Sequence, residues 1–237
     1  MAALILRILL FAASVYLYFT DIEALDFTLM PRLDFGGTLL IVIGLTLACS
    51  MLFRIIPNKR IAIGARKHYA CSYTAPALEV SAGELAAAEK RLHKGAFLSG
   101  LNWAFITVLL LFALVMFDLL TPAAVVIIAL LYSVTDLIFI LIFCPFRALF
   151  MHNRCCTVCR IYNWDYFMMC APLIVFPSVY SGGLGLLSVI VLIRWELAVK
   201  KNTHFFMPET NVGLRCEGCE IRCRSHGEWR NSTDINL

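Results

Sequence analysis

The stretch 123-AAVVIIALLYSVTDLIFILIF-143 decides the fold class, because Asp136 is its single charged residue. A helix needs about 20 consecutive apolar residues to cross the hydrocarbon core of a bilayer. Similar runs occupy residues 2–20, 36–53 and 97–117, and each ends near a charged residue, Pro or Gly. The apolar residues are continuous rather than alternating, which indicates helices and not a barrel. We therefore expect an all-α, polytopic helical membrane protein.

The overall composition leads to the same class. The chain is 61% hydrophobic and 15% charged, whereas a soluble domain has about 25% charged residues. One soluble core cannot bury this excess of apolar side chains, so lipid must solvate part of it. The net charge of +4 is small and scattered, which argues against nucleic acid as a partner. The bilayer is the expected partner, and a protein partner or a homo-oligomer stays open.

Region 166–193 is uncharged, too long for one crossing and short for two. Its middle, 177-PSVYSGG-183, contains residues that favour a turn. Arginines and lysines flank the region on both sides, so both flanks are expected on the same side of the membrane. We predict a hairpin of two short or tilted helices, about 161–177 and 183–199. This makes about six transmembrane helices, or five if 166–193 is a single span.

The distribution of charge predicts the orientation. The segment after the first span is acidic, whereas the longer segment after the second span is rich in Lys and Arg. Basic loops stay in the cytoplasm. We therefore expect an uncleaved first span, both termini in the cytoplasm, and location in the cytoplasmic (inner) membrane. The predicted domains are a transmembrane domain over 1–199, with cytoplasmic loops 54–96 and 144–165, and a Cys-rich cytoplasmic tail over 200–237.

Within the basic loop, 81-SAGE-84 matches a capping box, in which Ser81 bonds a free amide of the first turn and Glu84 reaches back to Ser81. It predicts a helix over about 82–94. We interpret this helix as a short interfacial helix that leads into the third span.

Cysteines gather on the predicted cytoplasmic side. Cys156 and Cys159 form one Cys-x-x-Cys pair, and Cys216 and Cys219 form another. Each pair can direct two sulfurs at one ion, and two pairs complete a tetrahedral site. We predict a thiolate metal centre with these four as first ligands. Cys155, Cys223 and Cys144 are the next candidates, and His152 and His226 are additional ones.

Zinc and an iron–sulfur cluster both fit such a ligand set. Zinc would hold the tail to the loop, whereas an iron–sulfur cluster would suit electron transfer at the membrane face. Each cluster of cysteines can also form its own site. A third interpretation is a membrane thiol oxidoreductase, since both pairs have the spacing of a redox-active dithiol. Disulfides are disfavoured in a reducing compartment. For Cys49, Cys71 and Cys170 we expect inert packing or a free thiol.

Asp136 lies near the middle of its span, where an ionisable group is costly unless it is paired, protonated or facing water. One interpretation is a small transporter or channel in which Asp136 lines a polar path. The other is a carboxyl group bonded to Tyr132, Ser133 or Asn102. No nucleophile–base arrangement, phosphate loop or dinucleotide motif occurs, so a hydrolase or a nucleotide enzyme has no support in the sequence. Whether the chain is another kind of enzyme stays open.

The C-terminal half resembles a group of prokaryotic multipass membrane proteins whose activity is uncharacterised. The matching stretches are 144-CPF-146, 153-NRCCTVCRIYNWD-165, 194-RWE-196 and 214-LRCEGCEIRC-223. They contain an NRCCxxCRIxxWD loop and a CxxCxxxC tail. The resemblance implies that the Cys segments and the Trp–acid pairs belong together.

Overall fold

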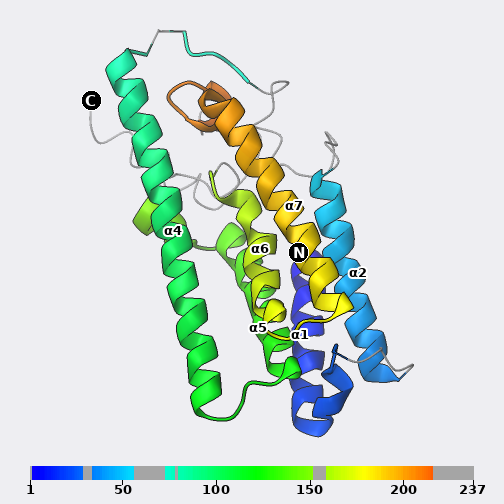
Figure 1. Cartoon of the computed structure of the whole chain (residues 1–237). Helices are drawn as coiled ribbons and strands as arrows, with labels where there is room; N and C mark the ends of the chain where they lie inside the picture. The colour runs from blue at the N-terminus through cyan, green and yellow to red at the C-terminus, as the bar shows by residue number, and fades with distance from the viewer. Residues whose placement is uncertain (1, 29–33, 56–72, 78–79, 152–158, 216–237) are drawn as a thin grey trace. The chain divides into compact units, whose positions relative to one another are not determined.

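The computed structural model describes residues 2–28, 34–55, 73–77, 80–151 and 159–215, and all regular structure in these ranges is helical. Five helices there are long and apolar enough to cross a membrane (Figure 1). They are α1 (Ala2–Thr20), α2 (Phe35–Ile55), α4 (Ala82–Met116), α5 (Pro122–Leu141) and α7 (Val179–Lys201). The expectation of an all-α, polytopic helical protein is confirmed.

The shorter helical segments lie between and after these spans. They are η1 (Ile22–Leu25), η3 (Arg147–Met151), η5 (Tyr162–Trp164), α6 (Asp165–Cys170), η6 (Ala171–Val175), η7 (Thr203–Phe206) and η8 (Val212–Leu214).

The chain divides into two compact units, and each unit combines three segments that are separated in the sequence. The first comprises Met1–Ile61, Gly100–Leu137 and Asn163–Leu197, and the second comprises Ala62–Ser99, Ile138–Tyr162 and Ala198–Leu237. Helices α4, α5 and α7 each contribute residues to both units. The second unit collects the polar segments that were predicted to lie on one side of the membrane.

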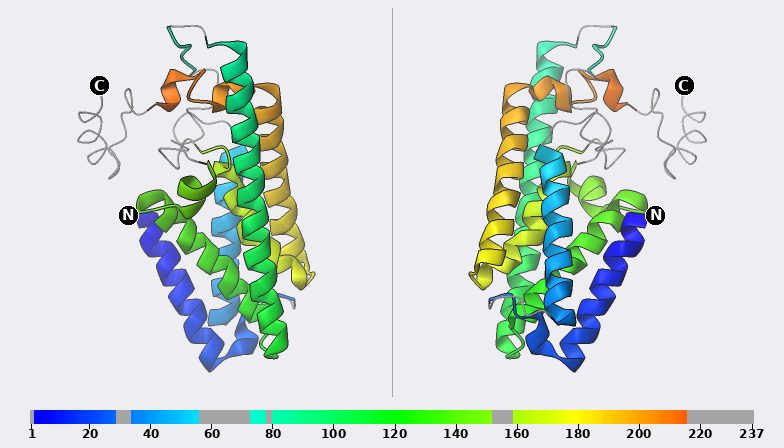
Figure 2. Two further views of the ribbon diagram at one scale, coloured as in Figure 1. Left: turned by 90° about the vertical axis from the view of Figure 1, so that its left-hand side faces the viewer. Right: turned by 90° about the vertical axis from the view of Figure 1, so that its right-hand side faces the viewer.

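The first unit is built around an apolar core to which α1, η1, α2, α5, α6 and α7 all contribute. Leu25, Leu40, Val125 and Met169 are essentially inaccessible in that core. η1 lies where α1 meets α2 (Figure 2). The short α6 therefore belongs to the core although it is too short to span a membrane.

Region 166–193 forms a hairpin with unequal arms. The first arm, α6 and η6, has 11 residues and rises only ~16 Å at 1.5 Å per residue, about half of a hydrocarbon core. Pro172 ends regular α-helix there, because it lacks an amide hydrogen and its ring clashes with the preceding turn. The second arm, α7, has 23 residues and rises ~34 Å. The region is therefore one full span preceded by a short return segment.

α7 begins at Val179, four residues before the predicted start, so the turn is shorter than expected. Ser178 explains the earlier start. Its Oγ accepts the amide hydrogen of Ser181 at 3.1 Å, and its own amide donates to Ser181 Oγ at 2.9 Å. This reciprocal pair satisfies amides that the first turn of a helix leaves free.

α4 differs from the prediction because it is one continuous helix of 35 residues, not an interfacial helix followed by a span. Its capping box is confirmed: the Glu84 amide donates to Ser81 Oγ at 3.3 Å, and the Ser81 amide donates to Glu84 Oε2 at 3.1 Å. Gly95 lies inside the helix at a cost of about 1 kcal/mol relative to Ala. Glycine is nevertheless required here, because the Cβ of any other residue would lie 2.6 Å from the Phe150 carbonyl oxygen.

Candidate functional site

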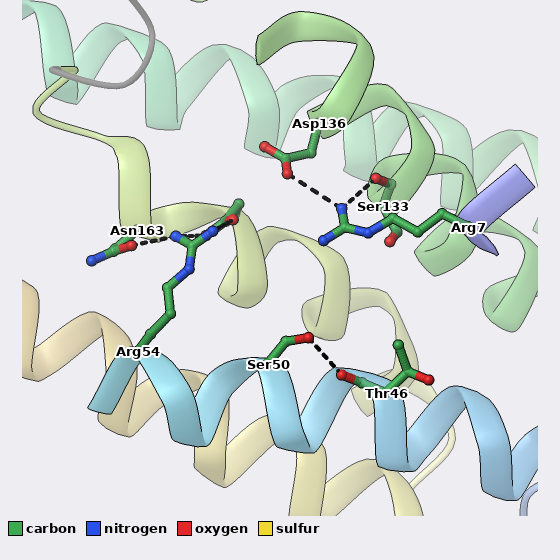
Figure 3. A network of polar contacts seen from close by, with 8 residues as sticks. Arg7, Thr46, Ser50, Arg54, Ser133, Asp136 and Asn163 are labelled. Carbon is green, nitrogen blue, oxygen red and sulfur yellow. Dashed lines mark hydrogen bonds and ion pairs between the residues drawn. The ribbon is translucent and has the colours of Figure 1, made fainter. Parts of the chain in front are cut away.

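Asp136 pairs with an arginine that lies far away in the sequence. Arg7 of α1 places Nη1 3.4 Å from Asp136 Oδ2, and the same nitrogen donates to the Ser133 carbonyl oxygen at 2.7 Å (Figure 3). The two charged side chains are 15% and 19% exposed. The contact joins α1 to α5 and compensates a carboxylate that would be costly alone at this depth.

None of the three partners suggested for Asp136 by the sequence is bonded to it. The Ser133 carbonyl oxygen instead shares the Arg7 guanidinium, and the Tyr132 hydroxyl lies 2.9 Å from Thr107 Oγ1. Sequence reasoning missed Arg7 because a basic residue near the start of a first span is expected at the membrane surface.

A second ion pair joins the end of α2 to the start of α6. Arg54 Nη2 lies 2.8 Å from Asp165 Oδ2, and Nη1 donates to Asn163 Oδ1 (Figure 3). The guanidinium carbon also lies 4.7 Å from the centre of the Tyr166 ring, a cation–π arrangement. These side chains are 12% and 6% exposed. Arg54 is therefore held by two charge-assisted contacts and an aromatic face.

The two ion pairs form one electrostatic cluster. The charges of Arg54 and Asp165 act on Asp136, and that of Arg7 acts on Asp165. Two arginines and two aspartates carry no net charge together, which lowers the cost of placing them among apolar helices. Such a cluster can hold α1, α2, α5 and α6 together. Its arginines and aspartates can also exchange partners when one of the four charges changes.

Polar groups extend the cluster along two helices. On α2, Thr46 and Ser50 precede Arg54 at intervals of one turn, and Ser50 Oγ donates to the Thr46 carbonyl oxygen at 2.7 Å (Figure 3). On α1, Ser14 lies two turns from Arg7 on the same face and is completely buried. Within the described residues Ser14 Oγ has no hydrogen-bond partner. A buried polar group without a partner is costly.

The segment 163-NWD-165 anchors three helices to one point. Asn163 and Asp165 bind Arg54 of α2, and Trp164 Nε1 donates to Glu196 Oε1 of α7 at 2.7 Å. A Cβ at Gly100 of α4 would lie 2.9 Å from the Trp164 ring, so the ring packs against the helix backbone there. The contact between Trp164 and Glu196 closes the hairpin, because the first arm starts where the second arm ends.

Most of the predicted metal ligands lie outside the described residues. This holds for Cys155, Cys156, Cys216, Cys219, Cys223, His152 and His226. Of the two that are described, Cys159 is buried, and Cys144 Sγ accepts the Arg147 amide hydrogen at 3.4 Å. The described ranges contain no group of three or more His, Cys, Asp or Glu side chains that could hold a metal ion.

In the second unit, the chain leading to each Cys cluster lies against one face of α4. Phe150 and Met151 precede the first cluster, and their carbonyl oxygen and sulfur lie where a Cβ of Gly95 would be. Glu209 precedes the second cluster, and its Oε1 lies 3.0 Å from Arg91 Nη2. Arg91 and Gly95 are one turn apart, so they share a face of the helix.

Further contacts fix the segment before the second cluster. The Val212 amide donates to the Thr74 carbonyl oxygen at 2.9 Å, and the rings of His204 and Phe205 pack against Tyr73. The Asn211 amide group donates to the Phe205 carbonyl oxygen at 2.9 Å. This part of the chain therefore has a defined position within the second unit.

No protein-family model matches this chain, and no curated protein or solved structure matches it either. The function is therefore inferred from the residues and their geometry.

Proposed function

We propose that the chain is a multipass protein of the cytoplasmic membrane that carries a cysteine-ligated metal centre at its cytoplasmic face. Cys156, Cys159, Cys216 and Cys219 are the first ligands. Cys155, Cys223 and Cys144 are the next candidates, with His152 and His226 as additional ligands. The orientation follows from the basic residues between α2 and α4, because a loop rich in Lys and Arg favours the cytoplasmic side of the membrane.

The observation that supports this proposal is the shared face of α4. Met151 and Glu209 approach adjacent turns of that helix, at Gly95 and Arg91, and these turns are separated by only ~6 Å along the axis. Cys156 follows Met151 by five residues and Cys216 follows Glu209 by seven, and fully extended chains of these lengths reach about 18 Å and about 25 Å. Both Cys-x-x-Cys pairs can therefore reach one ion.

The identity of the metal decides the role. Zinc in a closed tetrahedron of thiolates would hold the tail to the loop and stabilise the second unit. An iron–sulfur cluster would carry electrons at the membrane face. The arginines near both Cys pairs suit either centre, because they offset thiolate charge.

Metal analysis of the full-length protein, purified without oxygen or chelator, tests the proposal. We expect about one tetrahedral site per chain, with zinc and no colour, or iron with acid-labile sulfide and visible absorption. Cys219→Ser should lose most of the metal, whereas Cys49→Ser, a change on α2 in the first unit, should retain it. Unchanged metal in Cys219→Ser would overturn the ligand assignment. Wild-type protein without metal would leave thiol chemistry as the function of the cysteines.

A second function, a small transporter or channel, is favoured by the charged cluster in the first unit. Arg7 and Asp136 place a paired charge within two spans, and Ser14 adds a buried polar group two turns along α1. Proteoliposomes that contain a pH-sensitive dye can test protons as the moving species. Wild-type protein should dissipate an imposed pH gradient faster than Asp136→Asn. Equal rates for the two proteins would remove protons as the species that moves.

A further inference from the structure

A basic pocket lies in the second unit, and none of the residues that line it is a cysteine or one of the two arginines and two aspartates of the charged cluster. It encloses about 710 Å³ and is lined by the N-terminal part of α4 and by the segment that follows η7. Four of its lining side chains are cationic and two are acidic, which leaves an excess of two positive charges. The charged lining residues are Lys90, Arg91, Lys94, Arg215, Glu84 and Glu209.

The acidic side chains of the pocket are already occupied by other contacts. Glu84 accepts from the amide and hydroxyl of Ser81 in the capping box, and Glu209 accepts from Arg91. Arg215 donates to the Pro208 and Glu209 carbonyl oxygens, so its charge is held in place but is not neutralised by a carboxylate. The excess positive charge is therefore available to a ligand.

Lys90 and Lys94 supply most of that free charge. They are one turn apart on the exposed face of α4, and within the described residues neither forms an ion pair or a hydrogen bond. Two ammonium groups with an arginine beside them match an anion with several oxygen acceptors, and a phosphoryl group is the common anion of this kind.

The position of the lysines along α4 places Lys94 at the depth of lipid headgroups and Lys90 one turn farther out. The helix has 35 residues and is ~52 Å long, ~22 Å longer than the hydrocarbon core. Its apolar part starts at Phe97, so Lys94 lies ~4.5 Å and Lys90 ~10 Å outside the core. The headgroup layer on each side is about 5–7 Å thick. Lys94 therefore lies within this layer, and Lys90 lies ~3 Å beyond it.

We propose that this pocket is a binding site for a phosphoryl anion, supplied by the headgroup of an anionic phospholipid or by a soluble phosphate ester. None of the residues that line the pocket is a proposed metal ligand, so phosphoryl binding is measured separately from metal content. Binding should weaken with added salt, since salt screens charges that are open to solvent.

The test uses the full-length protein in neutral detergent and three ligands. Short-chain phosphatidylglycerol is the anionic lipid, phosphatidylcholine is the zwitterionic control, and glycerol phosphate is the soluble ester. Native mass spectrometry measures retained lipid, and equilibrium dialysis measures glycerol phosphate. We expect wild-type protein to retain phosphatidylglycerol in preference to phosphatidylcholine, and the Lys90→Gln/Lys94→Gln variant to bind at least about tenfold more weakly.

Lys200→Gln/Lys201→Gln is the matched control, because it removes the same charge from the exposed last turn of α7, whose lysines do not line the pocket. This control should bind like wild type, and circular dichroism should show both variants folded. Glycerol phosphate binding that depends on Lys90 and Lys94 would identify a soluble ester as the source. The proposal is overturned if neither phosphate ligand binds, or if binding survives in the Lys90→Gln/Lys94→Gln variant.

Discussion

The Arg54 guanidinium lies 2.8 Å from the Asp165 carboxylate and joins the last turn of α2 to the first residue of α6. Both side chains are nearly inaccessible, so each charge depends on the other for compensation. A buried pair adds little net stability relative to apolar residues, but loss of one partner leaves an uncompensated charge. The same reasoning applies to Arg7 and Asp136, which are only slightly more exposed.

Asp165→Ala should therefore lower the free energy of unfolding by about 3 kcal/mol or more, because the buried Arg54 loses the carboxylate that compensates its charge. The double variant Arg54→Met/Asp165→Leu should recover most of that loss, since no charge remains. Reversible unfolding in mixed micelles measures both. Glu209→Ala is the control, because it breaks the ion pair to the largely exposed Arg91 and should cost under about 1 kcal/mol. Equal costs for Asp165→Ala and Glu209→Ala would contradict the burial argument.

The two ion pairs should be energetically coupled. The Asp165 charge acts on Asp136, and the Arg7 partner of Asp136 acts on Asp165. A double-mutant cycle of Asp136→Asn and Asp165→Asn should therefore show an interaction energy above ~0.5 kcal/mol, which exceeds the scatter of independent sites. Asp136→Asn combined with Glu84→Gln, which lies in the capping box of the second unit, should be additive. Additivity in both cycles would mean that the two pairs act separately.

Gly95→Ala should destabilise the second unit by about 1–3 kcal/mol, because a Cβ there would lie 2.6 Å from the Phe150 carbonyl oxygen and 3.0 Å from Met151 Sδ. Gly83→Ala is a matched change on the same helix, with no atom within 4 Å of the new methyl group. It should stabilise α4 by up to about 1 kcal/mol through helix propensity. Thermal unfolding monitored by circular dichroism distinguishes these opposite signs.

Gly95→Ala also tests the convergence of the two Cys segments on α4. If Phe150 and Met151 are displaced, the metal content per chain should fall, whereas in Gly83→Ala it should not change. A Gly95→Ala variant that is destabilised but keeps full metal content would separate the packing on α4 from the proposed centre.

Trp164→Phe should cost about 1–3 kcal/mol, because it removes the 2.7 Å hydrogen bond to the partly buried Glu196 carboxylate. Glu196→Gln keeps an acceptor oxygen and should cost less. Hydrogen exchange of the α6 and α7 amides measures the effect, and faster exchange should be confined to the ends of the hairpin arms. Equal exchange in wild-type protein and Trp164→Phe would show that the contact does not hold the hairpin closed.

Part of the molecule is evident from the sequence because it depends on local properties. Hydropathy over about 20 residues identifies a span without reference to the rest of the chain, and α1, α2, α5 and the apolar part of α4 were predicted in this way. The capping box over Ser81 and Glu84 was also predicted, because its two residues are three positions apart.

The predictions that missed concern α4 and the two arms of the hairpin. α4 continues through Gly95. A glycine is present there because Phe150 and Met151 pack against the helix and leave no room for a Cβ. The first hairpin arm is short because Pro172 interrupts it, and the second begins early because Ser178 caps it. Composition alone did not show whether Pro172, Ser178 or the turn-favouring stretch 177-PSVYSGG-183 would set the ends of the two arms.

The amino-acid sequence by itself determined the helical class, four of the spans and the two Cys-x-x-Cys pairs. Only the tertiary structure decided that Asp136 pairs with Arg7 and Asp165 with Arg54, residues more than one hundred positions apart in the chain. It also decided that the segments before both Cys clusters meet on one face of α4. The physical reason is that a charge inside apolar surroundings must find an opposite charge in space, and the packing of the helices selects which one it meets.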